Sequence, residues 1–173
     1  MTKLALAGLV VALTVGTLPA TEIEGELYGT FGAAKIEDLD AGYDLGGGGG
    51  VLFGSTIRAG FDIEGQVIHT SQDVLGIDVD LDIKIVLLNL VLEGDGPIRP
   101  YFVIGGGYAN SDVSGTVSSV TLSVDLGNNG VGDAGGGIKF VINDHFMIGG
   151  DFRYFRISDV NVARGALVIG GKF

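Results

Sequence analysis

The sequence contains no cysteine, no tryptophan and only 3 prolines among 173 residues. The lack of cysteine excludes disulfide bonds and a lipid anchor attached through a cysteine. Positive charges are also scarce, because 10 lysines and arginines stand against 21 aspartates and glutamates. The resulting net charge of −11 argues against nucleic-acid binding. Beyond residue 20, no apolar run reaches the length of about 18 residues that a membrane-spanning helix needs.

Despite these absences the chain is apolar on average, with a mean hydropathy of +0.46. Glycine is abundant, at 32 residues, and so much glycine disfavours helices. An apolar chain without a helical span either has a large soluble core or forms a transmembrane β-barrel. At this length we expect a single domain.

The C-terminal segment, Arg164 to Phe173, alternates between two kinds of side chain. One face is apolar or small (Gly165, Leu167, Ile169, Gly171 and Phe173), and the other has a cation at each end (Arg164, Ala166, Val168, Gly170 and Lys172). This period of two residues is typical of a strand with lipid on one side and a polar lumen on the other. For this segment alone, the last strand of a soluble sandwich or lipocalin-like barrel is the alternative.

Residues 1–20 have the pattern of a secretory signal peptide. Lys3 is followed by an apolar core from Leu4 to Val15 and by a small residue at Ala20. The apolar core is too short to span a bilayer comfortably. Cleavage after Ala20 would leave residues 21–173 as the mature barrel domain, and an uncleaved N-terminal anchor is the alternative.

The mature chain has eight strand-like segments, which cover residues 24–36, 43–54, 56–70, 77–93, 98–110, 131–142, 146–157 and 164–173. Connections after the second, fourth and sixth segments are short, and the others are mostly longer, as in membrane barrels. Residues 117–126 also alternate, so they either lengthen the sixth strand or add a hairpin that makes ten strands. We predict an all-β fold, an eight-stranded antiparallel transmembrane β-barrel.

The alternation assigns side chains to the two faces of this barrel. Apolar side chains predicted to contact lipid are Ile57, Phe61, Ile63, Ile138, Phe140, Ile148, Phe152, Leu167 and Ile169. Ionisable side chains predicted to form one salt-bridge network in the lumen are Arg58, Asp62, Glu64, Lys84, Asp133, Lys139, Asp151 and Arg153. Lys84 enters this set because the opposite face, at Ile83 and Ile85, is apolar. The pattern then changes phase near Val86, and we expect a β-bulge there.

Three segments resemble a known family: GPIRPYFVIGGGYANSDV at 96–113, VGDAGGGIKFVINDHFMIGGDFRYFRISDV at 131–160, and the terminal VIGGKF. An Arg-Pro-Tyr step enters a glycine-rich strand, and a second glycine-rich strand leads through a short turn to an Asp-x-Arg-Tyr strand. This order resembles the small bacterial outer-membrane barrels of the OmpW, OmpX and OmpA type.

The resemblance implies a place in the outer membrane of a Gram-negative bacterium, in contact with lipid and lipopolysaccharide. It implies a non-enzymatic role in envelope structure, surface interaction or passage of small hydrophobic molecules. It also implies that Phe173, as a terminal aromatic, belongs to the signal read by the barrel-assembly machinery.

An eight-stranded barrel leaves room only for side chains or one small ligand. The lumenal charges therefore form a structural plug or line a polar path, and a sealed plug predicts little steady ion conductance. With Lys172 included, five cations face four anions, so we expect the lumen to be nearly neutral.

Two short motifs suggest other chemistry. Asp78-x-Asp80-x-Asp82 lacks the glycine and glutamate of an EF-hand loop, so neither a metal site nor a cofactor is predicted. His69-Thr70-Ser71 resembles the His-x-Ser pair of lipid A deacylases, which leaves a lipid-modifying enzyme as an alternative. A secreted soluble barrel that binds a small ligand is a further alternative.

Overall fold

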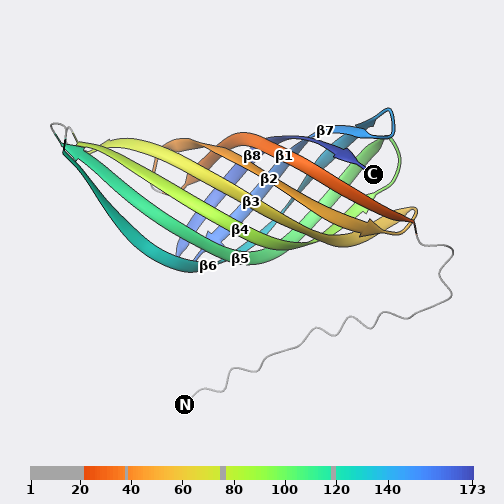
Figure 1. Ribbon diagram of the computed structural model, residues 1–173, viewed down its shortest axis with the longest axis horizontal. Helices are drawn as coiled ribbons and strands as arrows, with labels where there is room; N and C mark the ends of the chain where they lie inside the picture. The colour runs from red at the N-terminus through yellow and green to blue at the C-terminus, as the bar shows by residue number, and fades with distance from the viewer. Residues whose placement is uncertain (1–21, 38, 75–76, 118–119) are drawn as a thin grey trace, which may run out of the picture.

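The computed structural model describes residues 22–37, 39–74, 77–117 and 120–173. The predicted signal peptide, residues 1–20, lies outside the described residues. Eight strands follow one another along the chain (Figure 1): β1 Ile23–Ile36, β2 Ala41–Phe53, β3 Ile57–Val74, β4 Ile77–Gly94, β5 Ile98–Val117, β6 Val120–Ile142, β7 Phe146–Ile157 and β8 Val160–Lys172. Within the described residues, no helix is long and apolar enough to cross a membrane.

The eight strands close into one antiparallel barrel. Each strand pairs with its neighbour in sequence, and β1 pairs with β8 from Glu26↔Lys172 to Ile36↔Val162. The predicted eight-stranded barrel is confirmed. The segment 117–126 adds no further hairpin, because its described residues lengthen β5 and β6.

Short turns close the barrel end where β1 begins and β8 ends, which we call the terminal end, and they cover residues 54–56, 95–97 and 143–145. Positive φ angles allow these reversals. Gly54 and Gly96 have φ of 125° and 100°, and Asn143 and Asp144 have φ of 52° and 58°. Glycine has no Cβ to clash in this region, and Asn and Asp tolerate it better than most residues.

At the opposite end, four adjacent strands project beyond the other four (Figure 1). β3, β4, β5 and β6 contain 18, 18, 20 and 23 residues, whereas β1, β2, β7 and β8 contain 14, 13, 12 and 13. We call the projecting part of β3–β6 the extension. The expectation of longer connections at this end is wrong, because the additional residues form strand instead of loop.

The pairing of β4 corrects the predicted face of Lys84. β4 pairs with β3 in unbroken register from Ile57↔Gly94 to Val74↔Ile77, so the bulge expected near Val86 is wrong. The register shift falls in the β5–β6 pair instead, between Asn110 and Asp112. Without a change of phase, Lys84 lies on the outer surface.

The side chain of Lys84 is 61% exposed, and its Nζ lies 3.0 Å from Asp112 Oδ2. The physical reason is that the lumen itself changes character along β4. Toward the extension its inward side chains are apolar, and Ile83 and Ile85 are buried there. The polar face of β4 near Lys84 therefore points outward. It lies closer to the extension than the apolar outer side chains of β4, such as Leu88 and Leu90, which form part of the apolar belt around the barrel.

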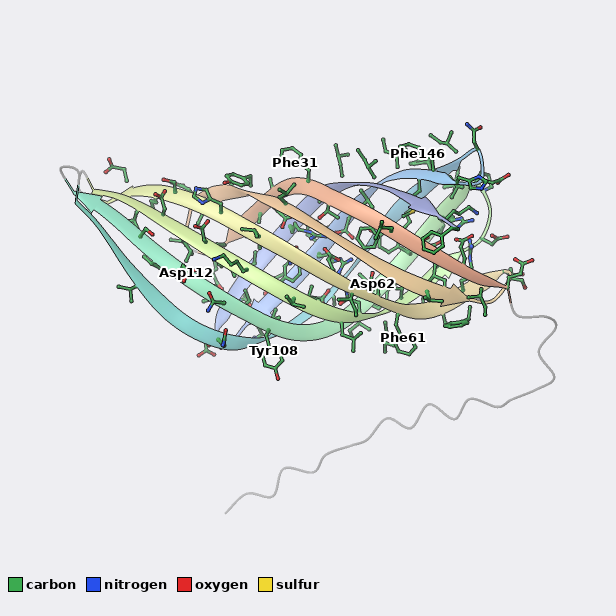
Figure 2. The ribbon with its side chains drawn as sticks, viewed as in Figure 1. Phe31, Phe61, Asp62, Tyr108, Asp112 and Phe146 are labelled. Carbon is green, nitrogen blue, oxygen red and sulfur yellow. The ribbon has the colours of Figure 1, made fainter. Side chains whose placement is uncertain are left out.

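The nine side chains predicted to contact lipid all lie on the outer surface, with exposures from 38% for Ile148 to 72% for Ile57. Figure 2 shows Phe31, Phe61 and Tyr108 projecting from the outside of the barrel. Asp62, the next residue after Phe61, is buried inside. Apolar groups exposed over so much of a surface would be unfavourable in water, and they match a lipid environment.

Candidate functional site in the barrel lumen

The lumen is charged in the half nearest the termini and apolar toward the extension. Toward the extension the apolar residues form one buried cluster: Ala34, Ile36, Ile68, Ile83, Ile85, Leu87, Ala109, Val131, Phe155, Ile157 and Val162. A smaller cluster of Leu52, Val91 and Val103 lies among the charged residues of the other half. Buried ionisable side chains fill most of that half, and all eight strands contribute to them. Because strand alternation sends every second side chain inward, each strand delivers both kinds to the lumen.

The charges closest to the chain ends form the terminal network, which comprises Glu24, Glu26, Arg58, Glu93, Arg99, Lys139 and Lys172. Glu93 lies 2.7 Å from Lys139 and 3.2 Å from Arg99. Glu24 lies 2.6 Å from Arg99 and 2.9 Å from Arg58. Carboxylate oxygens of Glu24, Glu26 and Glu93 lie within 4.8 Å of one another. The surrounding cations neutralise them, so ion pairing accounts for this cluster.

Deeper in the barrel lies the central network, which comprises Asp44, Asp62, Glu64, Asp133, Asp151, Arg153 and Arg164. Arg153 contacts Glu64 at 2.8 Å and Asp133 at 3.2 Å. Arg164 contacts Asp151 at 2.5 Å and Glu64 at 2.8 Å. Each guanidinium therefore joins carboxylates from different strands and ties the barrel wall together across its interior.

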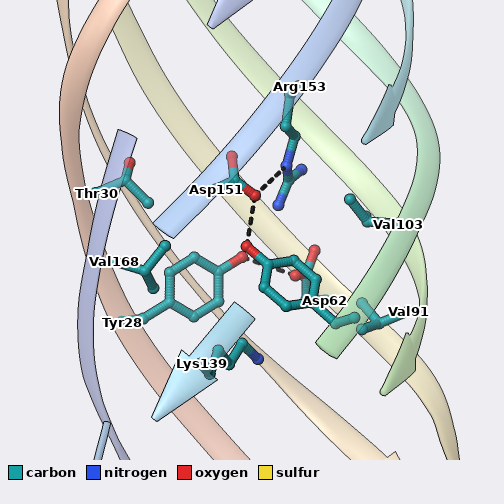
Figure 3. A pocket seen from close by; sticks show the side chains of 10 residues that line it. Tyr28, Thr30, Asp62, Val91, Val103, Lys139, Asp151, Arg153 and Val168 are labelled. Atoms are coloured by element: carbon teal, nitrogen blue, oxygen red, sulfur yellow. Dashed lines mark hydrogen bonds and ion pairs between the residues drawn. The ribbon is translucent and has the colours of Figure 1, made fainter. Parts of the chain in front are cut away.

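The side chains of two tyrosines fill the lumen between the terminal and central networks. The Tyr28 hydroxyl donates to Asp62 at 2.7 Å, and the Tyr101 hydroxyl donates to Asp151 at 2.5 Å. Figure 3 shows Tyr28, Asp151 and Arg153 converging on this point. The cavity between these side chains has a volume of about 10 Å³, which is at the lower limit for one water molecule. The charged part of the lumen is thus a packed plug.

The structure places seven of the eight predicted lumenal residues inside the barrel: Arg58, Asp62, Glu64, Asp133, Lys139, Asp151 and Arg153. Only Lys84 lies outside. The seven do not form the single network that we predicted. Arg58 and Lys139 belong to the terminal network, and the other five belong to the central network.

Six partners in these networks were not among the predicted network residues: Glu24, Glu26, Asp44, Glu93, Arg99 and Arg164. All are buried except Glu24, which is partly exposed, and the sequence pattern places Arg164 on the polar face of the last strand. Alternation alone gives the faces of Glu24 and Glu26, which share a side of β1 with Tyr28. The alternation after Val86 set Glu93 on the polar face of β4, but Glu93 was left out of the predicted network. The lumenal charges are divided unevenly between the networks: in the central network five carboxylates share two guanidinium groups among the described residues, whereas the terminal network has four cations for three carboxylates.

The apolar half of the lumen opens into a cavity of about 180 Å³ near the extension. We call it the outer chamber, and it is lined by Leu39, Thr70, Gln72, Val79, Leu81 and Val113. Leu39 and Leu81 pack against the buried apolar cluster below. The Thr70 hydroxyl donates to the carbonyl of Asp40 at 2.9 Å, which leaves the lining mostly apolar.

The His69-Thr70-Ser71 motif does not form a catalytic arrangement in the structure. His69 Nδ1 lies 2.7 Å from Asp82 Oδ1, and its ring stacks on Tyr43 with 4.9 Å between centroids. In the described part of the chain, no hydrogen bond joins Ser71 to His69. A nucleophile needs contact with its base, so His69 is better explained as part of a surface cluster on β2, β3 and β4.

The C-terminal residue Phe173 is fixed beside the start of β1. Gly25 and Phe173 exchange two backbone hydrogen bonds, of 2.8 and 2.9 Å. A Cβ on residue 25 would lie 2.5 Å from the Phe173 ring, so glycine makes room for that ring. Phe173 is 83% exposed, so its aromatic ring is presented at the outer surface of the barrel rim.

A closed eight-stranded barrel with an apolar exterior and a charged interior is typical of membrane-spanning β-barrels. A family model described as "Outer membrane protein beta-barrel domain" matches residues 5–173. The chain belongs to this family. As an outer membrane protein beta-barrel domain protein, it is located in the bacterial outer membrane. No protein with a curated description matches it significantly.

Solved structures show the same fold. Ail, the attachment invasion locus protein of Yersinia pestis, is 18% identical with a TM-score of 0.65, over 88% of this chain and 99% of Ail. A major outer membrane protein from Thermus thermophilus is 10% identical with a TM-score of 0.66, over 88% and 100% of the two chains. Neisserial surface protein A is 12% identical with a TM-score of 0.52, over 89% and 98%. At these identities the likeness concerns the barrel fold alone.

The packed plug predicts that this outer-membrane barrel does not conduct ions steadily. Reconstituted into planar bilayers, the protein is expected to show no sustained current, because the cavity beside Tyr28 and Tyr101 holds at most one water. A steady single-channel conductance from verified folded protein would show that the plug opens.

Proposed function

We propose that this protein is a non-enzymatic outer-membrane barrel that binds small apolar molecules at its outer mouth. The observation that carries the proposal is the outer chamber, an apolar cavity set above a sealed plug. In barrels of this kind the longer parts of the hairpins face the outside of the cell, and here the extension makes β3–β4 and β5–β6 the longer hairpins, so the extension and its chamber face outward.

The size and lining of the outer chamber fit a ligand of one to three rings or a short alkyl chain. Its volume is about 180 Å³. An apolar cavity of about 150 Å³ is known to take up benzene in another protein. Val79, Leu81 and Val113 supply apolar walls, and Gln72 supplies one polar group at the mouth. A mostly apolar pocket with few polar groups is the usual form of a small-molecule site.

The route out of the chamber follows from the shape of the barrel. Passage along the axis is blocked by the plug. β1 ends at Ile36 and β8 begins at Val160, so the wall on the side of β1, β2, β7 and β8 is lower than the extension. A bound apolar molecule would leave over this low rim, toward the lipid. The protein would then concentrate such molecules at the membrane surface without opening a pore.

The proposal predicts binding of an apolar dye such as 1-aminoanthracene, measured by fluorescence enhancement on purified folded protein. Leu81→Asp is expected to weaken binding by roughly tenfold or more, because an apolar ligand would have to cover an unpaired carboxylate in the wall of the cavity. Val124→Asp is the matched control: Val124 also lies on the extension, but it is 58% exposed. Equal affinity of the two variants, both folded by heat-shift gel, would count against a ligand in the chamber.

A second candidate function, binding of a surface partner, is favoured by a free sheet edge on the extension. β6 pairs with β5 from Val120 onward, but it pairs with β7 only from Val131. Within the ranges that the structure describes, the β6 backbone at 120–126 therefore has no paired strand on the β7 side. Such an edge is a template for an added strand from another protein. Failure of dye binding in the folded protein would make this edge the better basis for function.

The apolar belt and the C-terminal strand suggest the remaining partners. Outer-membrane lipid and lipopolysaccharide would surround the belt. The exposed ring of Phe173 would be available to the barrel-assembly machinery during insertion, as expected for a terminal aromatic in this family.

A further inference from the structure

A glycine on β5 brings two oxygen atoms together in the central part of the lumen. Asn89 pairs with Gly105 across β4 and β5, and Gly105 pairs with Asp133 across β5 and β6. A Cβ on residue 105 would collide with Asn89 Oδ1 and would lie 2.7 Å from Asp133 Oδ1. Because Gly105 has no side chain, Asn89 Oδ1 and Asp133 Oδ1 can both lie beside its Cα, and we call the space between these two oxygens the cradle.

Both oxygens are buried acceptors that face each other. Asn89 and Asp133 are 0% and 5% exposed. The Asn89 amide donates from Nδ2 to Asp62 at 2.7 Å, and this bond turns its Oδ1 away from Asp62. Asp133 Oδ2 accepts from Arg153 at 3.2 Å. Among the described residues, neither Asn89 Oδ1 nor Asp133 Oδ1 has a hydrogen-bond partner.

Two facing acceptors in a protein interior repel each other unless something positive lies between them. The charge balance around them points the same way, because the five carboxylates of the central network share only Arg153 and Arg164 within the described part of the chain. The cradle over Gly105 is therefore a place where positive charge would stabilise the plug most.

We propose that a small hard cation of the sodium class binds over Gly105, between Asn89 Oδ1 and Asp133 Oδ1. The carbonyl oxygen of Leu88 lies 2.7 Å from the same Cβ position and brings a third oxygen close to the cradle. Calcium prefers six to eight oxygen ligands and magnesium keeps several waters. The three oxygens near Gly105 are too few for either ion, so a monovalent ion that accepts few ligands fits this set of oxygens better. Bound there, the ion holds β4, β5 and β6 together from inside.

The test uses the full chain, refolded in a zwitterionic detergent, and follows urea unfolding by circular dichroism. Sodium chloride is titrated against N-methylglucamine chloride at constant ionic strength, because that organic cation is too large for the cradle. The urea midpoint of the natural protein is expected to rise with sodium concentration, as it does for any ligand that binds only the folded state. Sodium retained after desalting, measured by mass spectrometry, gives a second readout.

Asp133→Asn is expected to abolish the sodium dependence, because its amide donates directly to Asn89 Oδ1 and takes the place of the ion. Gly105→Ala, which fills the cradle, is expected to abolish it too. The matched control is Asp144→Asn, which removes a negative charge in the exposed 143–145 turn and should keep the full sodium dependence. A midpoint of the natural protein that does not respond to sodium would overturn the proposal and indicate a proton shared by the two oxygens.

Discussion

Replacing Arg164 with methionine is expected to lower the free energy of unfolding by about 3–5 kcal/mol, because it leaves buried carboxylates without their partner. Arg164 is 0% exposed and contacts Glu64 at 2.8 Å and Asp151 at 2.5 Å, and it also donates a hydrogen bond to Gln66. Without Arg164, Glu64 and Asp151 keep only Arg153 as a cationic partner among the described residues. Asp44, which lies 3.5 Å from Arg164, loses its ion pair. Equilibrium urea unfolding of the refolded barrel measures the difference.

The matched control for this change is Lys84→Met, which removes the same kind of charge from an exposed ion pair. Lys84 lies outside the barrel beside Asp112, and exposed pairs contribute about 0–1 kcal/mol. We therefore expect a small effect there. Equal losses of unfolding free energy in both variants would mean that water reaches the charged lumen and that Arg164 is not desolvated in the folded barrel.

Introducing arginine at Phe61 is expected to destabilise the inserted barrel by about 2–4 kcal/mol, since a charge near the middle of the lipid-facing belt is costly. Phe61 is 56% exposed on the outer surface and lies four residues into β3. The same change at Ile57, the first residue of β3, places the charge at the rim, where the cost is about 0–1 kcal/mol.

Urea unfolding in lipid vesicles distinguishes the two positions. In a detergent or aqueous environment with no depth dependence, both variants would behave alike. A difference that appears only in lipid identifies the belt as the membrane-facing surface. Negligible effects at both depths would contradict the assignment of this face to lipid.

Much of the fold could be predicted from the sequence because the two faces of a strand are encoded locally. In β7, Phe152 and Arg153 follow each other and fall on opposite sides of the wall, as the period of two dictates. The same rule gave the lipid-facing side chains and most of the lumenal charges. Strand number followed from counting such segments.

Alternation predicted the wrong face for side chains where the environments on both sides of the barrel wall change along a strand. In β4 the lumen changes from charged to apolar while the outside changes from apolar to polar. Lys84 was therefore assigned to the wrong face, and the apparent slip near Val86 was interpreted as a bulge. When both environments change together, polar and apolar residues still alternate along the strand, but the apolar residues now face the lumen and the polar residues face outward. Only the register with β3 and β5 resolves this.

By itself, then, the sequence determined that this chain forms an eight-stranded barrel with an apolar outer face, because alternation is a property of neighbouring residues. The tertiary structure decided which charges meet. Arg164 and Glu64 lie 100 residues apart in sequence, and only closure of the barrel brings them to 2.8 Å. The same closure sets Asn89 against Asp133 over Gly105 and leaves the outer chamber above the plug, since both depend on strand register and on which side chains share one enclosed space.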